Sequence, residues 1–235
     1  MRRGFGILTA VLLLTAATAT PFGGWAVVTV MDMPTHLEVG QATTIAFQVR
    51  QHGKTLLDEL HPTLTLRRSD AGFFASMFKR DRVDATYRPD AGVYEARITP
   101  ADTGEVSITI DTDFRSTRVE LLPIRVVASN ARIGPPAPED RGRQLYAAKG
   151  CATCHVKEDD AAFAEWQVVR AGPDLTNRSF PREWITQKLA NPAAFRSAAY
   201  NGNVMPNLEL SAAEIDALAS YLEQDRVATQ ATQRP

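Results

Sequence analysis

Residues 150–155 of the chain read Gly-Cys-Ala-Thr-Cys-His, and this short stretch decides how the second half of the sequence is interpreted. It contains both cysteines of the 235-residue chain, Cys151 and Cys154, and His155 follows directly. A pair of cysteines with this spacing can form a disulfide, a redox-active dithiol, half of a zinc site or the attachment point of a haem. The rest of the sequence has to separate these four possibilities.

Three of the four possibilities lack support elsewhere in the chain. A structural zinc ion needs two further ligands, and the other histidines, His36, His52 and His61, all lie in the first third of the sequence. A thioredoxin-like dithiol follows a strand and opens a long helix in a βαβ unit, and no such pattern surrounds Cys151. A plain surface disulfide has no stronger support than these two.

The spacing itself favours covalent attachment of a haem. Two thiols one helical turn apart can reach the two vinyl groups of the porphyrin, and the next residue is then placed beneath the iron. We therefore expect one haem c, with thioether bonds to Cys151 and Cys154 and with His155 as an axial ligand of the iron.

Met205 is the candidate for the opposite side of the iron, because no other methionine follows His155. Asparagine and proline surround it in residues 203–207, which indicates a loop rather than a core helix. A neutral thioether raises the reduction potential, and six filled positions leave no site for a substrate. This ligand set suits electron transfer. A core methionine and an open sixth position, as in a haem enzyme or gas sensor, stay as alternatives.

The residues around this motif have helical periodicity. We expect helices at 139–149, 180–190 and 212–224. Ser211 and Glu214 form a capping box at the start of the last helix, in which each side chain bonds to the other residue's backbone N–H group. The second half is therefore predicted to be all-α.

The first half has a different pattern, with apolar residues at alternate positions. Ile45, Phe47 and Val49 lie on one face of a predicted strand, and similar strands are expected at 25–30, 62–66, 73–78, 93–98, 106–110 and 118–127. About seven strands without a helix predict an antiparallel, immunoglobulin-like sandwich over residues 25–127. Tyr94 resembles the tyrosine corner of such folds, and residues 128–138, with three prolines, form a linker.

The N-terminus has the pattern of an export signal. Arg2 and Arg3 precede an apolar run, and residues 17–19 have the small-x-small form of a cleavage site, so we expect residues 1–19 to be a signal peptide or an uncleaved anchor. The mature chain is then extracytoplasmic or periplasmic, and it touches a membrane only through such an anchor. The formal net charge is −1 and no basic cluster occurs, which argues against nucleic acid as a partner.

Residues 139–226 resemble the class I cytochromes c. The resemblance rests on the order of these residues: Gly142, Leu145 and Tyr146, then Cys151, Cys154 and His155, then residues 172–176 (Gly-Pro-Asp-Leu-Thr), then Trp184, Met205, Pro206, Leu218 and Tyr221. It implies that the first and last helices cross at Gly142, that the Pro173 carbonyl accepts the Nδ1 proton of His155, and that Trp184 and Arg178 contact the haem propionates. Residues 227–235 follow as a disordered tail.

The sandwich resembles small periplasmic immunoglobulin-like modules, which implies a docking or positioning role. A copper site is an alternative, because Met31, Met33 and His36 offer two thioethers and an imidazole. A cupredoxin with a binuclear copper centre is excluded, because that centre needs cysteines of its own. His52 and His61, beside turns, are expected on the surface.

The sequence thus predicts a mono-haem carrier that moves single electrons between redox partner proteins. A related possibility is an electron-entry or accessory subunit of a membrane respiratory or photosynthetic complex. An enzyme or gas sensor with an open sixth position and a copper-binding module are the alternatives from other classes.

Overall fold

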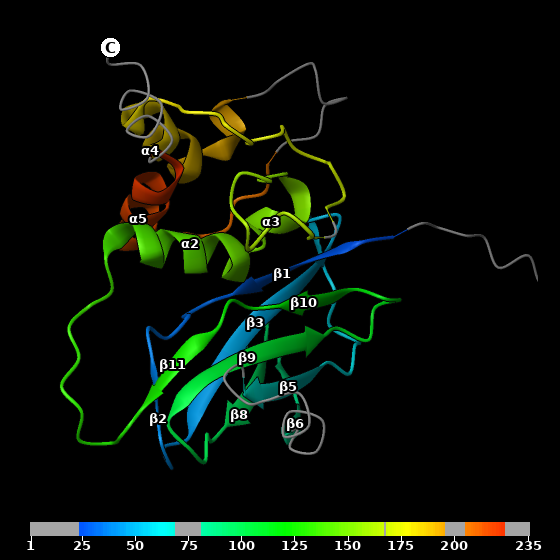
Figure 1. The fold of residues 1–235 in the computed structure, drawn as a ribbon. Coiled ribbons are helices and arrows are strands. Elements are labelled where there is room, and N and C mark those ends of the chain that lie inside the picture. The colour runs from blue at the N-terminus through cyan, green and yellow to red at the C-terminus, as the bar shows by residue number, and fades with distance from the viewer. Residues whose placement is uncertain (1–23, 69–80, 167, 196–204, 224–235) are drawn as a thin grey trace, which may run out of the picture.

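The structure is a computed structural model that describes residues 24–68, 81–166, 168–195 and 205–223. A sandwich of strands (residues 26–127) comes first in the chain, and a helical domain (residues 138–223) lies against its β1 side (Figure 1). The expected signal peptide, the expected strand at 73–78 and the expected tail lie outside the described residues. Within the described ranges, no helix is long and apolar enough to cross a membrane.

Two sheets make up the sandwich. In the first sheet the order is β1 (Ala26–Val30), β3 (Thr43–Gln51), β8 (Val93–Ile98) and β7 (Thr86–Arg88), with β4 (Thr55–Leu56) beside β3. In the second sheet it is β2 (Leu37–Glu38), β11 (Ile124–Val127), β9 (Gly104–Asp111), β5 (Thr63–Arg68) and β6 (Asp81–Asp84), with β10 (Arg118–Glu120) beside β9. The strand pairs are antiparallel except β2 with β11, which is parallel.

The core between the sheets is built from the alternating positions of the sequence. Ile45, Phe47 and Val49 on β3 are fully buried, and so are Ile108 and Ile110 on β9. Each fully buried side chain of this size contributes roughly 1.5–3 kcal/mol through removal of apolar surface from water. The predicted sandwich is therefore confirmed, and it is held by packing without a disulfide, because both cysteines lie in the helical domain.

Three details differ from the sequence-based expectation. The strand expected at 118–127 is divided into β10 and β11, because Pro123 between them has no N–H group to donate. The short strands β2, β4, β6 and β7 have two to four residues each, too few to show alternation. The hydroxyl of Tyr94 donates to the Leu57 carbonyl at 2.9 Å and accepts from the Leu60 N–H. It therefore fixes a loop more than thirty residues earlier, whereas a tyrosine corner bonds to backbone only a few residues upstream.

The helical domain contains α2 (Pro138–Ala148), α3 (Cys151–Cys154), α4 (Arg182–Ala190), a short 3-10 helix (Pro192–Ala194) and α5 (Ala212–Glu223). The three predicted helices are confirmed, with their starts or ends shifted by one or two residues. Pro138, the last residue of the expected linker, is already the first residue of α2. The capping box is present, because the Ser211 N–H donates to Glu214 at 2.9 Å and the Glu214 N–H donates to Ser211 Oγ.

The crossing of α2 and α5 depends on Gly142. A Cβ atom at this position would overlap the carbonyl oxygen of Ala217 and would lie 2.6 Å from Cβ of Tyr221. Only glycine allows the two helices to approach so closely. The resemblance implies that Gly142 lets Leu218 or Tyr221 approach closely, and the structure confirms this for Tyr221, with the Ala217 backbone closer still.

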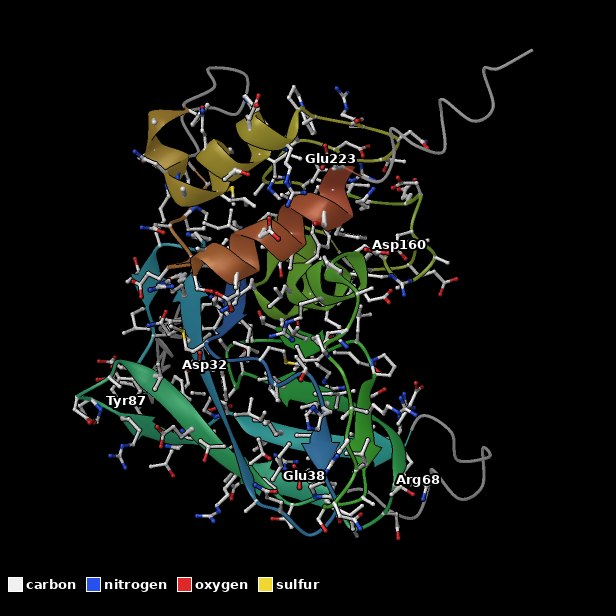
Figure 2. The ribbon with its side chains drawn as sticks, turned by 90° about the vertical axis from the view of Figure 1, so that its left-hand side faces the viewer. Asp32, Glu38, Arg68, Tyr87, Asp160 and Glu223 are labelled. Atoms are coloured by element: carbon white, nitrogen blue, oxygen red, sulfur yellow. The ribbon has the colours of Figure 1, made fainter. Side chains whose placement is uncertain are left out.

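Two long cationic side chains join the helical domain to the sandwich: one on α2 and one on the residue directly after its end. Lys149, which is 1% exposed, donates from Nζ to the Met31 carbonyl at 2.5 Å. Arg141 donates to the Met33 carbonyl at 2.5 Å. Figure 2 shows Asp32, the residue between Met31 and Met33 in the sequence, at the level where the strands meet the helices. The carbonyls at the end of β1 thus face α2 instead of solvent.

Candidate haem site

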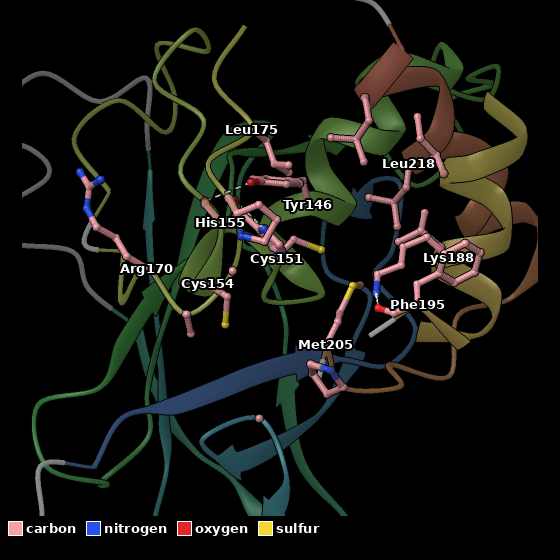
Figure 3. A pocket seen from close by; sticks show the side chains of 18 of the residues that line it. Tyr146, Cys151, Cys154, His155, Arg170, Leu175, Lys188, Phe195, Met205 and Leu218 are labelled. Carbon is pink, nitrogen blue, oxygen red and sulfur yellow. Dashed lines mark hydrogen bonds between the residues drawn. The ribbon is translucent and has the colours of Figure 1, made fainter. Parts of the chain in front are cut away.

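Helix α3 is a single turn that brings the two thiols and the imidazole to one side of the domain. It starts after Gly150, whose φ of 79° lies in the left-handed region that favours glycine. Cys151 and Cys154 are free cysteines, one on each end of the turn, and His155 follows with an extended backbone. In Figure 3 the sulfur atoms of Cys151, Cys154 and Met205 border the same space.

The ring of His155 is fixed from the side opposite to this space. Its Nδ1 lies 2.9 Å from the carbonyl oxygen of Pro173, as the resemblance implied. Gly172 packs against the ring, because a Cβ atom there would lie 2.6 Å from Nδ1. Burial lowers the pKa of His155 more than the hydrogen bond to Pro173 raises it. The neutral imidazole therefore keeps Nε2 as its available ligand atom.

The environment of the thiols does not fit a redox-active dithiol. Burial raises the pKa of Cys151 to about 12 and the pKa of Cys154 to about 11. Reactive cysteines have the opposite shift, because a thiolate is needed for attack. A zinc site fits no better, because the described residues contain no group of three or more His, Cys, Asp or Glu side chains that could hold a metal ion.

A large, mainly apolar pocket lies over this motif. Its volume is about 930 Å³, at the upper end of the usual range for ligand sites. Val169 and Trp184, the large apolar side chains that the described part of the chain leaves exposed, are each 40% exposed and line this pocket. Both side chains border the same pocket as Cys151, Cys154 and His155, so the pocket and its donor set fit a covalently attached haem.

The remaining predicted site residues lie on the walls of this pocket. Trp184 stacks on Phe180, with ring centroids 4.9 Å apart, and Arg178 lines the mouth. Met205 is partly buried, and its sulfur points into the space between Cys151 and Lys188 (Figure 3). The structure thus brings all the predicted site residues to one pocket, while contact of Trp184 or Arg178 with haem propionates stays a prediction.

Several pocket residues escaped the sequence analysis. Lys188 on α4 lines the pocket and donates from Nζ to the Phe195 carbonyl at 2.8 Å, and Trp25, His52, Gly53 and Lys54 of the sandwich line it as well. His52 is exposed, as expected, yet it borders this pocket. Helical periodicity places Lys188 near Trp184, but no sequence signal links residues 25–54 to a motif that begins a hundred positions later.

The copper hypothesis receives no support from the packing. Met33 is 4% exposed, and its side chain belongs to the core of the sandwich. The imidazole Nδ1 of His36 lies 3.1 Å from the hydroxyl of the neighbouring Thr35. The backbone carbonyl of Met31 accepts a hydrogen bond from Lys149, and the backbone carbonyl of Met33 accepts one from Arg141.

Comparisons with known proteins agree with this description of the helical domain. The family model described as "Cytochrome C oxidase, cbb3-type, subunit III" matches residues 137–222. No curated protein matches the chain.

Solved structures that are similar to this chain include domains 4 and 5 of the S-layer protein SbsC (14% identity, TM-score 0.30). The alignment covers 43% of this chain and spans about half, 51%, of the S-layer chain. For the Lin-41 filamin domain (15% identity, TM-score 0.32), the alignment covers 43% of this chain and 91% of the filamin domain. For the ZirS C-terminal domain (16% identity, TM-score 0.30), it covers 54% of this chain and 86% of the ZirS domain. These similarities are too weak to support any inference about the sandwich.

The family match covers the segment that carries the one-turn helix, its two thiols and the oriented imidazole. These three groups also line the apolar pocket. A cytochrome c domain implies haem c, and the two cysteines of the chain are consistent with one attachment site. Residues 138–223 form a helical cytochrome c domain, which follows an N-terminal β-rich region at residues 26–127.

Proposed function

We propose that this chain carries one haem c, bonded through Cys151 and Cys154, and transfers single electrons between redox partner proteins outside the cytoplasmic membrane. The observation that carries the proposal is the position of His155 and Met205 on one apolar pocket. An imidazole and a thioether together fill both axial positions of the iron, which suits reversible electron transfer and leaves no position for a substrate.

The residues of this chain would tune the haem rather than react with it. The Pro173 carbonyl fixes the His155 ring and makes it a stronger ligand. The apolar walls exclude water, which favours the less charged, reduced iron centre. The haem itself supplies the one-electron chemistry when it is bound.

The charges around the pocket support a partner with an acidic docking face. Among the described lining residues, Lys54, Arg170, Arg178 and Lys188 are cationic and none is acidic, although Arg170 lies 3.8 Å from Glu158 outside the lining. Two of these charges would compensate the two carboxylates of a haem, and the others would attract an acidic surface. Weak redox contacts of this kind are steered by charge and are small enough to separate after each transfer.

A second candidate function is an electron-entry subunit of a membrane respiratory complex. The observation in its favour is the family match to cbb3-type oxidase subunit III over residues 137–222. Membranes from producing cells, dissolved in mild detergent and separated by size, distinguish the two. Haem absorbance at the position of a large complex favours the subunit, and haem at the position of a single chain favours the free carrier.

The proposed function is tested by haem content and redox behaviour of the exported full-length chain. We expect a mass increase of one haem that survives denaturation, and a reversible oxidation that follows the one-electron Nernst equation. The double variant C151A/C154A should lose this covalent haem, whereas the control M31L/M33L should retain it. A purified wild-type chain without covalent haem would contradict the proposal.

A further inference from the structure

The outer face of the first sheet is buried at its β1 edge, where a sandwich would normally meet solvent, whereas Arg97 on β8 and Arg88 on β7 are exposed on the same face. Ala26, Val28 and Val30 of β1 point into the sandwich core, so Val27 and Thr29 point outward, yet each is only 2% exposed. On the neighbouring β3, Gln48 is 7% exposed. An outward face of an antiparallel sheet is usually polar and wet. At β1 this face is covered by the helical domain.

Both segments that carry the proposed haem ligands rest on this face. Gly150 directly precedes Cys151, and a Cβ atom there would overlap the side chain of Val27 and would lie 2.6 Å from the Val28 carbonyl. Pro206 directly follows Met205. A Cβ atom on Gly53, in the turn between β3 and β4, would lie 3.3 Å from the Cγ atom of Pro206.

Sandwich residues also form part of the pocket wall. The rings of Trp25 and His52 lie with their centroids 5.4 Å apart, and both border the pocket together with Gly53 and Met205. In Figure 3 the blue ribbon of β1 and the turn after β3 run beside Met205. Close to this turn, Arg50 on β3 lies 3.8 Å from Glu209, which belongs to the same segment as Met205.

We propose that the sandwich completes the haem site and braces Met205 in position to bind the iron, with Gly53 as a positioning residue. This inference rests on the proposed function. The residues from Met205 to Leu210 form neither helix nor strand, so the segment lacks the repeated backbone hydrogen bonds of a regular element. A wall behind the segment reduces the entropy lost when the thioether binds, and therefore keeps the sixth position closed.

The test inserts a side chain between the turn and Pro206. Asparagine tolerates the left-handed backbone of Gly53, where φ is +70°, so G53N adds bulk without requiring a new backbone conformation. The matched control is G40N. Gly40 has φ of +72° in the same sandwich, and a Cβ atom there would meet nothing within 4 Å.

We expect G53N to open the sixth position. In the dithionite-reduced full-length chain its apparent affinity for carbon monoxide should rise at least about tenfold, because the apparent affinity scales with the fraction of open iron. The long-wavelength absorption band of ferric haem bonded to a thioether should weaken in the same variant. G40N should match the wild type in both measurements.

A second variant approaches the contact from the helical domain, so that the result does not depend on the folding of one turn. E209K places a like charge opposite Arg50, in a pair whose side chains are 16% (Arg50) and 61% (Glu209) exposed, and should shift both measurements in the same direction as G53N but by less. Its matched control is E120K, at the exposed Arg67–Glu120 pair on the sandwich, which should have no effect.

The outcomes separate this inference from the proposed function. If the wild type excludes carbon monoxide and folded G53N and E209K exclude it equally well, the bracing role is overturned and the proposed function stands. If the wild type itself binds carbon monoxide readily, the His155–Met205 carrier fails, and the bracing role fails with it. An effect in both variants but in neither control supports the bracing role.

Discussion

At the scale of single residues, the proposed ligands differ in how firmly the protein holds them. The Pro173 carbonyl and Gly172 fix the ring of His155, and the hydroxyl of Tyr146 donates to the His155 carbonyl at 3.1 Å. Met205 belongs to a segment without regular secondary structure, and its neighbours Pro206 and Glu209 contact the sandwich. The Met205 position is therefore the more sensitive to change.

Replacing Met205 by alanine tests the sixth ligand. Loss of the thioether should remove the preference for reduced iron, so we expect M205A to lower the reduction potential by at least about 60 mV, a tenfold change for a one-electron couple. Spectroelectrochemical titration measures this shift. M33L is the control, because Met33 is buried in the sandwich core and should leave the potential unchanged. An unchanged potential in M205A would show that another group occupies the position.

Asp160 should make the stability of the helical domain depend on pH. Burial tends to raise its pKa, but hydrogen bonds from Arg143, Ala162 and Tyr221 outweigh burial and lower the pKa to about 2. The carboxylate then contributes stability that is fully present above the unfolded pKa of about 3.9 and is lost as the pH falls toward 2. Because the group is partly exposed, we expect roughly 1–2 kcal/mol.

The variant D160N checks this dependence. The difference in free energy of unfolding between wild type and variant, measured by denaturant titration, should be largest at pH 6–7 and should shrink between pH 4 and pH 2. A difference that stays constant over this range would mean that the charge of Asp160 contributes nothing.

At the scale of elements, the helical domain depends on one close helix crossing. Tyr146 on α2, Tyr221 on α5 and Phe163 between them form an aromatic cluster with ring centroids 5.0–6.5 Å apart. Geometry of this kind adds to the burial of apolar area. The cluster forms only because Gly142 allows the helices to meet.

Substitution of Gly142 by alanine should separate these helices. Alanine improves helix propensity by about 1 kcal/mol, but the new methyl group overlaps the Ala217 backbone, which cannot rotate away. We expect a net loss of roughly 2–3 kcal/mol in the free energy of unfolding. G134A is the control, because the space around Gly134 is open. A G142A variant as stable as the control would show that α2 and α5 can shift apart without cost.

At the scale of the whole molecule, Lys149 couples the two regions. It is buried, pairs with Glu214 at 2.7 Å and donates to the Met31 carbonyl of the sandwich. Removing its charge leaves a largely buried carboxylate and a buried carbonyl without this donor, so K149M should cost roughly 2–4 kcal/mol. R118M removes the exposed Arg118–Asp111 pair and should cost less than about 1 kcal/mol.

Thermal unfolding followed separately by far-UV circular dichroism and by haem absorbance checks this coupling. In K149M we expect both transitions to move to lower temperature, and in R118M neither. A shift of the haem transition alone would mean that Lys149 stabilises only the helical domain.

The sequence predicted the local features of this molecule better than the contacts between its regions. The Cys151–His155 spacing, the capping box at Ser211 and the alternation in β3 are local patterns, and each has its counterpart in the structure. The approach of Gly53 to Pro206 joins residues 153 positions apart, and no periodicity encodes it. The role of the sandwich therefore became visible only through packing.

In the proposed haem site, His155 and Met205 would together fill both axial positions of the iron. A carbon monoxide titration of the reduced full-length protein, followed in its visible spectrum, tests it most directly. We expect an unchanged spectrum, because Met205 would occupy the sixth position. Ready formation of a carbon monoxide complex would contradict it, and would instead indicate an open iron, as in a haem enzyme or gas sensor.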